Sequence, residues 1–328
     1  MYIRQLLNES TDRWIIFLKL FFTLIITFLL TMIFSIPHAI AIFRKMLTDA
    51  GANLSSIESI LSVFPQIESE LSTMSVASQM QVLESNLNLF LMLLGFIGMF
   101  LGIILCNKFL NGNTFLSLTT SRKRIDFNRV FFSFSLWGLI SLFMIILGYF
   151  MFPENYEINF NLEPFLILAI IVILLLPIQT SAEEYVFRGY MMQNLGLITR
   201  NRWFPLIASS LAFGLLHGAN PEIEKFGNIV FVFYIGSGLF AGIMTLMDEG
   251  MELALGWHAA NNMIAALLIT ADWTALQTHS VLKDISNPES MPLTDVLIPV
   301  LFFFPLVLYI FSKKYKWRNW KDKLFGQI

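Results

Sequence analysis

The sequence carries little charge for its length. Asp, Glu, Lys and Arg make up 13% of its 328 residues, whereas a soluble domain carries about 25%. Hydrophobic residues make up 56% of the chain, and the mean hydropathy is +0.68. So few charged side chains cannot cover the surface of a soluble protein of this size, and we expect a chain embedded in a lipid bilayer.

Several features that define other protein classes are absent from the sequence. Cys106 is the only cysteine and lies in an apolar run, which excludes an internal disulfide framework and predicts a small core residue. The sequence has no Gly-rich phosphate loop and no block of basic and aromatic residues, so we expect no nucleic-acid partner. The two halves of the chain do not mirror each other, which disfavours a transporter built from inverted repeats.

Long apolar runs are abundant. A membrane-spanning helix needs roughly 20 apolar residues, and the sequence predicts an all-α, polytopic transmembrane bundle of about eight helices. The first run follows Arg4 and Arg13, as in a signal peptide, but it is too long for one and predicts an uncleaved anchor. The eight runs are 14–36, 89–105, 130–150, 165–180, 204–216, 229–247, 253–269 and 296–310.

Basic residues alternate between the loops that join these runs. Loops on the cytoplasmic side of a membrane are rich in Lys and Arg. One side of the bundle holds Lys108, Arg122, Lys123, Arg124, Arg129, Arg200, Arg202 and the tail residues Lys313, Lys314, Lys316, Arg318, Lys321 and Lys323. The other side holds only Arg44, Lys45, Lys225 and Lys283. This bias predicts a multi-pass protein with both termini in the cytoplasm, in a membrane that we expect to be the bacterial cytoplasmic membrane.

Changes in polarity divide the chain into three regions. Residues 1–163 form an N-terminal membrane region with three helices and an acidic, amphipathic extracytoplasmic segment at about 45–88. Residues 164–272 form the core that carries the candidate chemistry. Residues 273–328 form an extracytoplasmic loop, the last membrane helix and a basic cytoplasmic tail.

The first candidate site contains two adjacent glutamates. Glu184 and Arg188 are four residues apart, so they share a helix face and can form an ion pair. Glu183 lies about 100° around the helix and is left free to act as a general base or acid. The alternative is an ion pair at a helix end at the membrane surface.

Two further candidate sites contain histidine. His217 ends an apolar run, four residues after Phe213. The alternative to a role in the site is a hydrogen-bonded histidine at the membrane interface. His258 and Asn262 are also four apart and could hold an oxyanion on one helix face, or could make a polar contact between helices. A carboxylate, histidines and an amide from three helices suit hydrolysis by an activated water.

These three motifs together resemble the CAAX-protease and bacteriocin-processing family, which includes the type II CAAX prenyl endopeptidases and bacterial Abi-like membrane proteins. The match is Glu183-Glu184 with Arg188, Phe213 with His217, and His258 with Asn262, within about residues 165–272. The resemblance implies an intramembrane endopeptidase that acts on a membrane-associated or lipid-modified peptide or protein.

The resemblance also implies roles for these residues. Glu183 would activate water, His217 would hold it, and His258 and Asn262 would stabilise the oxyanion. Glu184 and Arg188 would support the site. No cofactor is expected, although Glu183, His217 and His258 could supply three ligands to zinc in a metal-dependent variant.

One condition must be met for these residues to share a site. Loop charge makes the Glu183 helix run towards the cytoplasm and the His217 helix away from it, so the two side chains lie at one depth only if the helix breaks. We predict a break near Pro177. The alternatives to a protease are a non-catalytic scaffold or immunity protein, and a transporter that uses Glu183, Glu184 and Arg188 as an ion relay.

Overall fold

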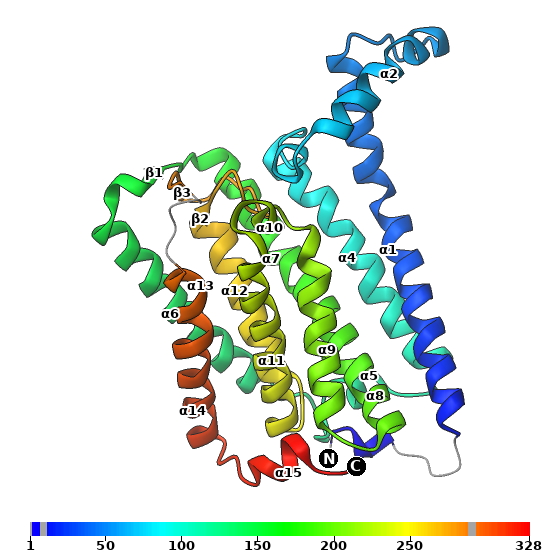
Figure 1. Cartoon of the computed structure of the whole chain (residues 1–328), viewed down its shortest axis with the longest axis vertical. Coiled ribbons are helices and arrows are strands. Elements are labelled where there is room, and N and C mark those ends of the chain that lie inside the picture. Colours follow the sequence, from blue (N-terminus) through cyan, green and yellow to red (C-terminus); the bar gives the residue numbers. More distant parts are fainter. Residues whose placement is uncertain (1, 7–11, 288–292) are drawn as a thin grey trace.

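The chain folds into a helical bundle. A computed structural model describes residues 2–6, 12–287 and 293–328, and in it the long helices run between two ends of the molecule (Figure 1). All eight predicted runs lie in helices. These are α1 (Arg13–Asp49), α4 (Ser85–Phe109), α6 (Phe127–Met151), α7 (Leu162–Glu184), α9 (Trp203–Leu216), α11 (Val230–Asp248), α12 (Glu252–Leu268) and a last helix made of α13 (Thr294–Ile298), a π-helix (Pro299–Phe303) and α14 (Phe304–Lys314).

Six helical stretches in the described residues are long and apolar enough to cross a membrane. The helices α9 and α12 are shorter, with 14 and 17 residues. Both nevertheless pack inside the bundle, α9 against α11, and α12 against α6 and α7. The protein is therefore an all-α, multi-pass integral membrane protein, as the sequence predicted.

Short elements connect these helices. The segment after α1 contains α2 (Ile57–Thr73) and α3 (Val76–Gln79), and α5 (Phe115–Thr119), α8 (Met192–Thr199), α10 (Pro221–Phe226) and α15 (Trp320–Phe325) join or end the others. The sequence did not predict a small sheet of β1 (Tyr156–Ile158), β3 (Leu282–Asp284) and β2 (Ile269–Thr270), in that order. In it β1 is antiparallel and β2 parallel to β3. The 3-10 turns are Arg4–Leu6, Pro153–Asn155, His217–Ala219 and Gly227–Ile229.

Small residues allow the core helices to approach closely. A Cβ atom added at Gly256 of α12 would lie 2.1 Å from the carbonyl oxygen of Val130 in α6. Lipid tails are as apolar as the helix side chains, so no hydrophobic effect drives membrane helices together, and they associate largely through such close backbone packing. This contact fixes α12, which carries His258, against α6.

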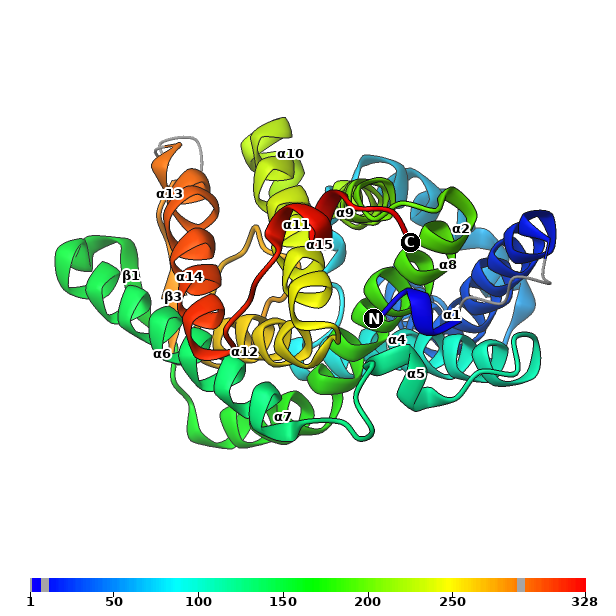
Figure 2. The same cartoon turned by 90° about the horizontal axis from the view of Figure 1, so that it is seen from below.

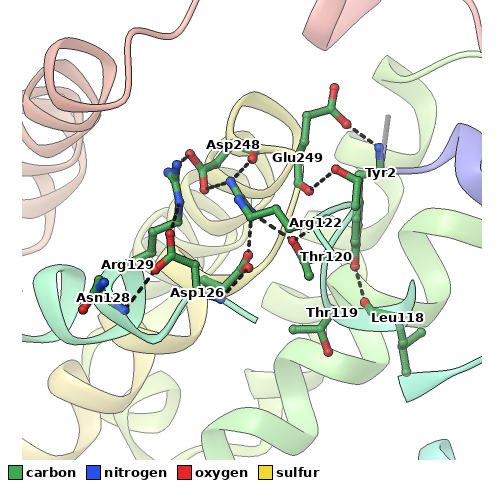
Figure 3. A network of polar contacts seen from close by, with 12 residues as sticks. Tyr2, Leu118, Thr119, Thr120, Arg122, Asp126, Asn128, Arg129, Asp248 and Glu249 are labelled. Carbon is green, nitrogen blue, oxygen red and sulfur yellow. Dashed lines mark hydrogen bonds and ion pairs between the residues drawn. The ribbon is translucent and has the colours of Figure 1, made fainter. Parts of the chain in front are cut away.

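Both termini lie at the same end of the bundle, together with α15 (Figures 1 and 2). A polar network closes this end (Figure 3). Arg122 pairs with Asp248 at 2.7 Å and with Glu252 at 2.9 Å, and Arg129 pairs with Asp248 at 2.6 Å. The backbone N–H of Tyr2 donates to Glu249. The network ties the N-terminus and the loop before α6 to the turn between α11 and α12.

The predicted break near Pro177 is wrong. Helix α7 continues through Pro177 to Glu184, because packing against α4 and α12 holds it while proline removes only one helical N–H donor. The irregularity lies further on, in the π-helix Tyr185–Met191, and the helical stretch extends to Thr199. Glu183 therefore lies about 24 Å from the end of this stretch at Thr199. Helix α9 starts at the same end of the bundle and is about 21 Å long, and His217 follows its last residue. The two residues reach similar depths without a break.

Candidate active site

A cavity of about 390 Å³ lies among α4, α7, α9, α11 and α12. Glu183, His217, His258 and Asn262 all line it. Glu184 and Arg188 lie behind it and are fully buried. The structure thus brings together the six residues that the sequence singled out, four at the cavity wall and two in support.

The ion pair of Glu184 and Arg188 forms the buried base of the site. Arg188 Nη1 donates to Glu184 Oε1 at 3.0 Å, and its Nη2 donates to the carbonyl oxygen of Gly238 at 3.2 Å. The guanidinium also lies over the ring of Phe213, 4.3 Å from its centroid, where the electron-rich face attracts a cation. The same Glu184 oxygen accepts a hydrogen bond from His258 Nδ1 at 2.8 Å. A single carboxylate therefore orients two donors, one from the next turn of its own helical stretch and one from α12.

His258 lies between the two glutamates. Because Nδ1–H donates to Glu184, the second ring nitrogen, Nε2, faces Glu183 Oε2 at 3.4 Å. The two atoms are near each other without a hydrogen bond, and Glu183 Oε2 has no hydrogen-bond partner among the described residues. A carboxylate and an imidazole side by side at a cavity wall are groups that general acid–base chemistry uses.

The tautomer of His217 follows from its backbone contact. Nδ1 lies 2.7 Å from the carbonyl oxygen of Phe213, which can only accept, so Nδ1 carries the proton. In the neutral ring Nε2 is then an acceptor. The ring stacks on Tyr234 with 4.4 Å between centroids, which fixes its plane. His217 can therefore accept a hydrogen bond from a water molecule in the cavity.

Asn262 belongs to a chain of amide hydrogen bonds. Trp137 Nε1 donates to Asn261 Oδ1 at 3.1 Å, and Asn261 Nδ2 donates to Asn262 Oδ1 at 3.1 Å. Asn262 Nδ2 then donates to Gln179 Oε1 at 2.9 Å. This bond uses one of the two N–H groups of the Asn262 amide, so the other is left to serve a ligand.

Sequence reasoning missed several residues of the cavity. Gln179 lies four residues before Glu183 on the same helix, so its place beside the site could have been found from helical spacing. Tyr234 and Glu222 line the cavity from α11 and α10. Their positions depend on how those helices pack and return, which spacing along the chain does not encode.

The metal-dependent variant, with zinc held by Glu183, His217 and His258, stays a prediction. Within residues 2–6, 12–287 and 293–328, no three His, Cys, Asp or Glu side chains are grouped so that they could hold a metal ion. Glu183, His217 and His258 line one cavity, but in this conformation they are not a three-ligand site. Cys106 is buried in α4, as expected of a small core residue.

The region of the chain that carries the candidate residues is similar to known proteins. Residues 162–264 match the family described as type II CAAX prenyl endopeptidase Rce1-like. The Bacillus subtilis (strain 168) protein YyaK, described as uncharacterized, is 32% identical over 170 residues. That alignment covers 52% of this chain and 57% of YyaK, so the chain spans just over half the length of the curated relative. No solved structure matches.

The matched residues contain α7, the π-helix, α9 with the 3-10 turn His217–Ala219, α11 and most of α12, and these carry all six candidate residues. The resemblance drawn from the three motifs is thereby confirmed. Residues 162–264 of the chain are thus similar to the Rce1-like family of type II CAAX prenyl endopeptidases.

Proposed function

We propose that the protein is an intramembrane endopeptidase that uses Glu183 to activate water. The observation that carries this proposal is the arrangement around His258, which joins the cavity-lining Glu183 to the buried Glu184–Arg188 pair. The family match over the same residues supports it. The substrate is a peptide or protein at the membrane.

The proposed reaction begins with a water molecule held between Glu183 and His217 Nε2. Glu183 takes a proton from this water as its oxygen attacks the carbonyl carbon of the scissile peptide bond. Negative charge then develops on the carbonyl oxygen, and protonated His258 and the second N–H of Asn262 stabilise it. As the tetrahedral intermediate collapses, the C–N bond breaks and Glu183 returns its proton to the leaving amine.

In this scheme Glu184 and Arg188 are positioning residues. Glu184 accepts from His258 Nδ1 and so keeps Nε2 directed at the cavity. Arg188 balances the charge of Glu184 in a place without water. An imidazole held by a buried carboxylate is better oriented, and its protonated form is better stabilised, than a free one.

The test compares membranes that contain the wild type with membranes that contain Glu183→Gln, by quantitative proteomics of peptide termini. Glutamine is nearly isosteric but cannot take a proton, and loss of a general base costs about 10²–10⁴-fold in rate. At least one peptide terminus that is present in the wild-type membranes should therefore be absent from the Glu183→Gln membranes. Glu163→Gln is the matched control, since Glu163 is an exposed residue of α7 outside the cavity. Identical termini in wild type and Glu183→Gln would overturn the proposal and favour a non-catalytic scaffold.

A further inference from the structure

The cavity extends to the end of the bundle opposite both termini, and we call this part of it the mouth. Its lining there comes from Glu222 of α10 and from residues 271 and 273–276 after β2. In Figure 1, α10 and the sheet lie in the upper half of the molecule, below α2, and the N- and C-termini lie at the bottom. The other end is closed by the network around Arg122 and Asp248 (Figure 3). We place the entry of the substrate at the end away from the termini.

That end is poor in basic residues. Of the 21 Lys and Arg residues in the chain, only Arg44, Lys45, Lys225 and Lys283 belong to it. Because cytoplasmic loops carry the excess of Lys and Arg, the mouth of the cavity faces away from the cytoplasm.

Carboxylates outnumber cationic groups on the cavity wall, even when His258 is counted as protonated. Three carboxylates, Glu183, Glu222 and Asp284, line it, and among the described residues no Lys or Arg does. Arg188 and Lys283 are already paired, with Glu184 at 3.0 Å and with Asp272 at 2.8 Å, and Lys225 of α10 does not line the cavity. A ligand that brings positive charge would balance the wall, whereas a ligand that ends in a free carboxylate would add to the repulsion.

Glu222 has an oxygen that lacks a partner. Its Oε1 accepts from the backbone N–H of Ala275 at 2.9 Å, while Oε2 is shielded from solvent and has no hydrogen-bond partner in the described part of the chain. A shielded carboxylate oxygen without a donor costs free energy that a bound cation would recover.

Two deeper side chains point independently to a polar ligand. Ser237 is 4% exposed and Trp257 is 2% exposed, and both line the cavity. Neither the Ser237 hydroxyl nor the Trp257 indole nitrogen has a hydrogen-bond partner among the described residues. Peptide carbonyl groups are acceptors that both could serve.

We propose that the substrate is a peptide segment on the extracytoplasmic side that places a Lys or Arg side chain against Glu222. The proposal rests on the proposed function, because it names the substrate class of the same site. Glu222 then selects the substrate, while Glu183 acts on the peptide bond deeper in the cavity. A prenylated tail that presents its free C-terminal carboxylate at this mouth does not fit the charge of the wall.

The test of selectivity uses quenched fluorescent peptides that differ at one position, which is Arg, Met or Glu. Wild type should have a kcat/KM for the Arg peptide at least about tenfold above that for the Met peptide, as expected for a charge-assisted contact. In Glu222→Gln this ratio should fall below about two, and in Glu222→Lys the Glu peptide should become the preferred one. A reversal of preference requires a folded protein, so misfolding cannot mimic it.

Glu224→Gln is the matched control, since Glu224 is an exposed residue on the same helix and does not line the cavity. It should keep the wild-type ratio. An unchanged Arg-to-Met ratio in Glu222→Gln would overturn the proposal while leaving the endopeptidase intact.

Fluorescence anisotropy separates the two proposals if no peptide is cut. Non-cleavable Arg and Met peptides should bind wild type with affinities that differ at least about tenfold. Binding with this preference but without cleavage would contradict the proposed function alone. Equal affinities would contradict the selectivity proposal whether or not cleavage occurs.

The direction of entry is tested by cysteine labelling in intact cells. The background is Cys106→Ala, which removes the only cysteine. Asn228→Cys, beside the mouth, and Lys321→Cys, in α15, replace exposed residues at opposite ends. A membrane-impermeant maleimide should label Asn228→Cys in intact cells and Lys321→Cys only after permeabilisation. The reverse pattern would overturn entry from the extracytoplasmic side.

Discussion

Replacing Glu184 by glutamine removes the negative charge that Arg188 and His258 share. Arg188 is 0% exposed, and Glu184 is the only carboxylate with which it forms an ion pair among the described residues. After the substitution its guanidinium keeps the bond to the Gly238 carbonyl and the contact with the Phe213 ring, but it has no countercharge in direct contact. The change is therefore expected to affect stability as well as activity.

The size of the effect follows from the burial of the pair. Removing one partner of a buried ion pair costs about 3–5 kcal/mol, because the other charge stays behind without compensation. Glu183→Gln leaves the Glu184–Arg188 pair intact and alters a residue at the cavity wall. It should therefore change the free energy of unfolding by less than about 1 kcal/mol, although it abolishes cleavage.

The assay is unfolding of the purified protein in detergent, followed by intrinsic fluorescence for wild type and both variants. A double variant, Glu184→Gln with Arg188→Met, removes both charges and should recover much of the lost stability, because an apolar replacement of a buried pair is often tolerated. Equal stabilities of Glu183→Gln and Glu184→Gln would refute the assignment of distinct roles to the two glutamates. So would a double variant less stable than Glu184→Gln.

Three other predictions concern helix packing, pH and metal dependence. Gly256→Ala should destabilise the protein by about 1–3 kcal/mol, because the added methyl meets the Val130 carbonyl; an unchanged unfolding curve would contradict the packing. Partial burial raises the pKa of Glu84, but bonds from two backbone N–H groups and from His279 bring the net value below the ordinary one. The Glu84 carboxylate therefore contributes to stability at pH values above its unfolded-state pKa, and this contribution is lost as pH falls through its folded-state pKa. Glu84→Gln should flatten the acid limb of a plot of unfolding free energy against pH, and an unchanged acid limb would contradict this. Cleavage should survive a zinc chelator, and loss that is restored by added zinc would contradict our expectation of no cofactor.

Much of the fold could be predicted because the membrane limits the choices. Apolar runs of sufficient length must be helices in a bilayer, where every backbone polar group needs an internal partner. All eight runs lie in helices for this reason. The small sheet could not be predicted, because β1 and β3 are three residues each and are separated by more than a hundred positions.

The error at Pro177 shows where local rules fail. Proline was expected to break the helix, but packing against two neighbours holds α7 continuous, and a π-helix forms at Tyr185–Met191 instead. No sequence rule places a π-helix, since the shift in the helical hydrogen-bond pattern depends on tertiary packing. At this position it carries Arg188 beside Glu184 in the core.

The candidate site was predictable as far as helical spacing reaches. Pairs four residues apart on one helix, such as Glu184 with Arg188, follow from the helical period. That His258 contacts both glutamates does not follow from spacing, because it depends on how α12 lies against α7. The unpartnered oxygen of Glu222 also appears only when the segment after β2 returns to α10.

The proposed mechanism requires one water molecule to contact both Glu183 and His217 within the cavity that His258 also lines. The most direct measurement is an experimental structure in lipid at a resolution that shows ordered water. We predict a water within about 2.6–3.2 Å of a Glu183 carboxylate oxygen and of His217 Nε2, the reach of a hydrogen bond that transfers a proton. Side chains too far apart for any single water to contact both would contradict the account.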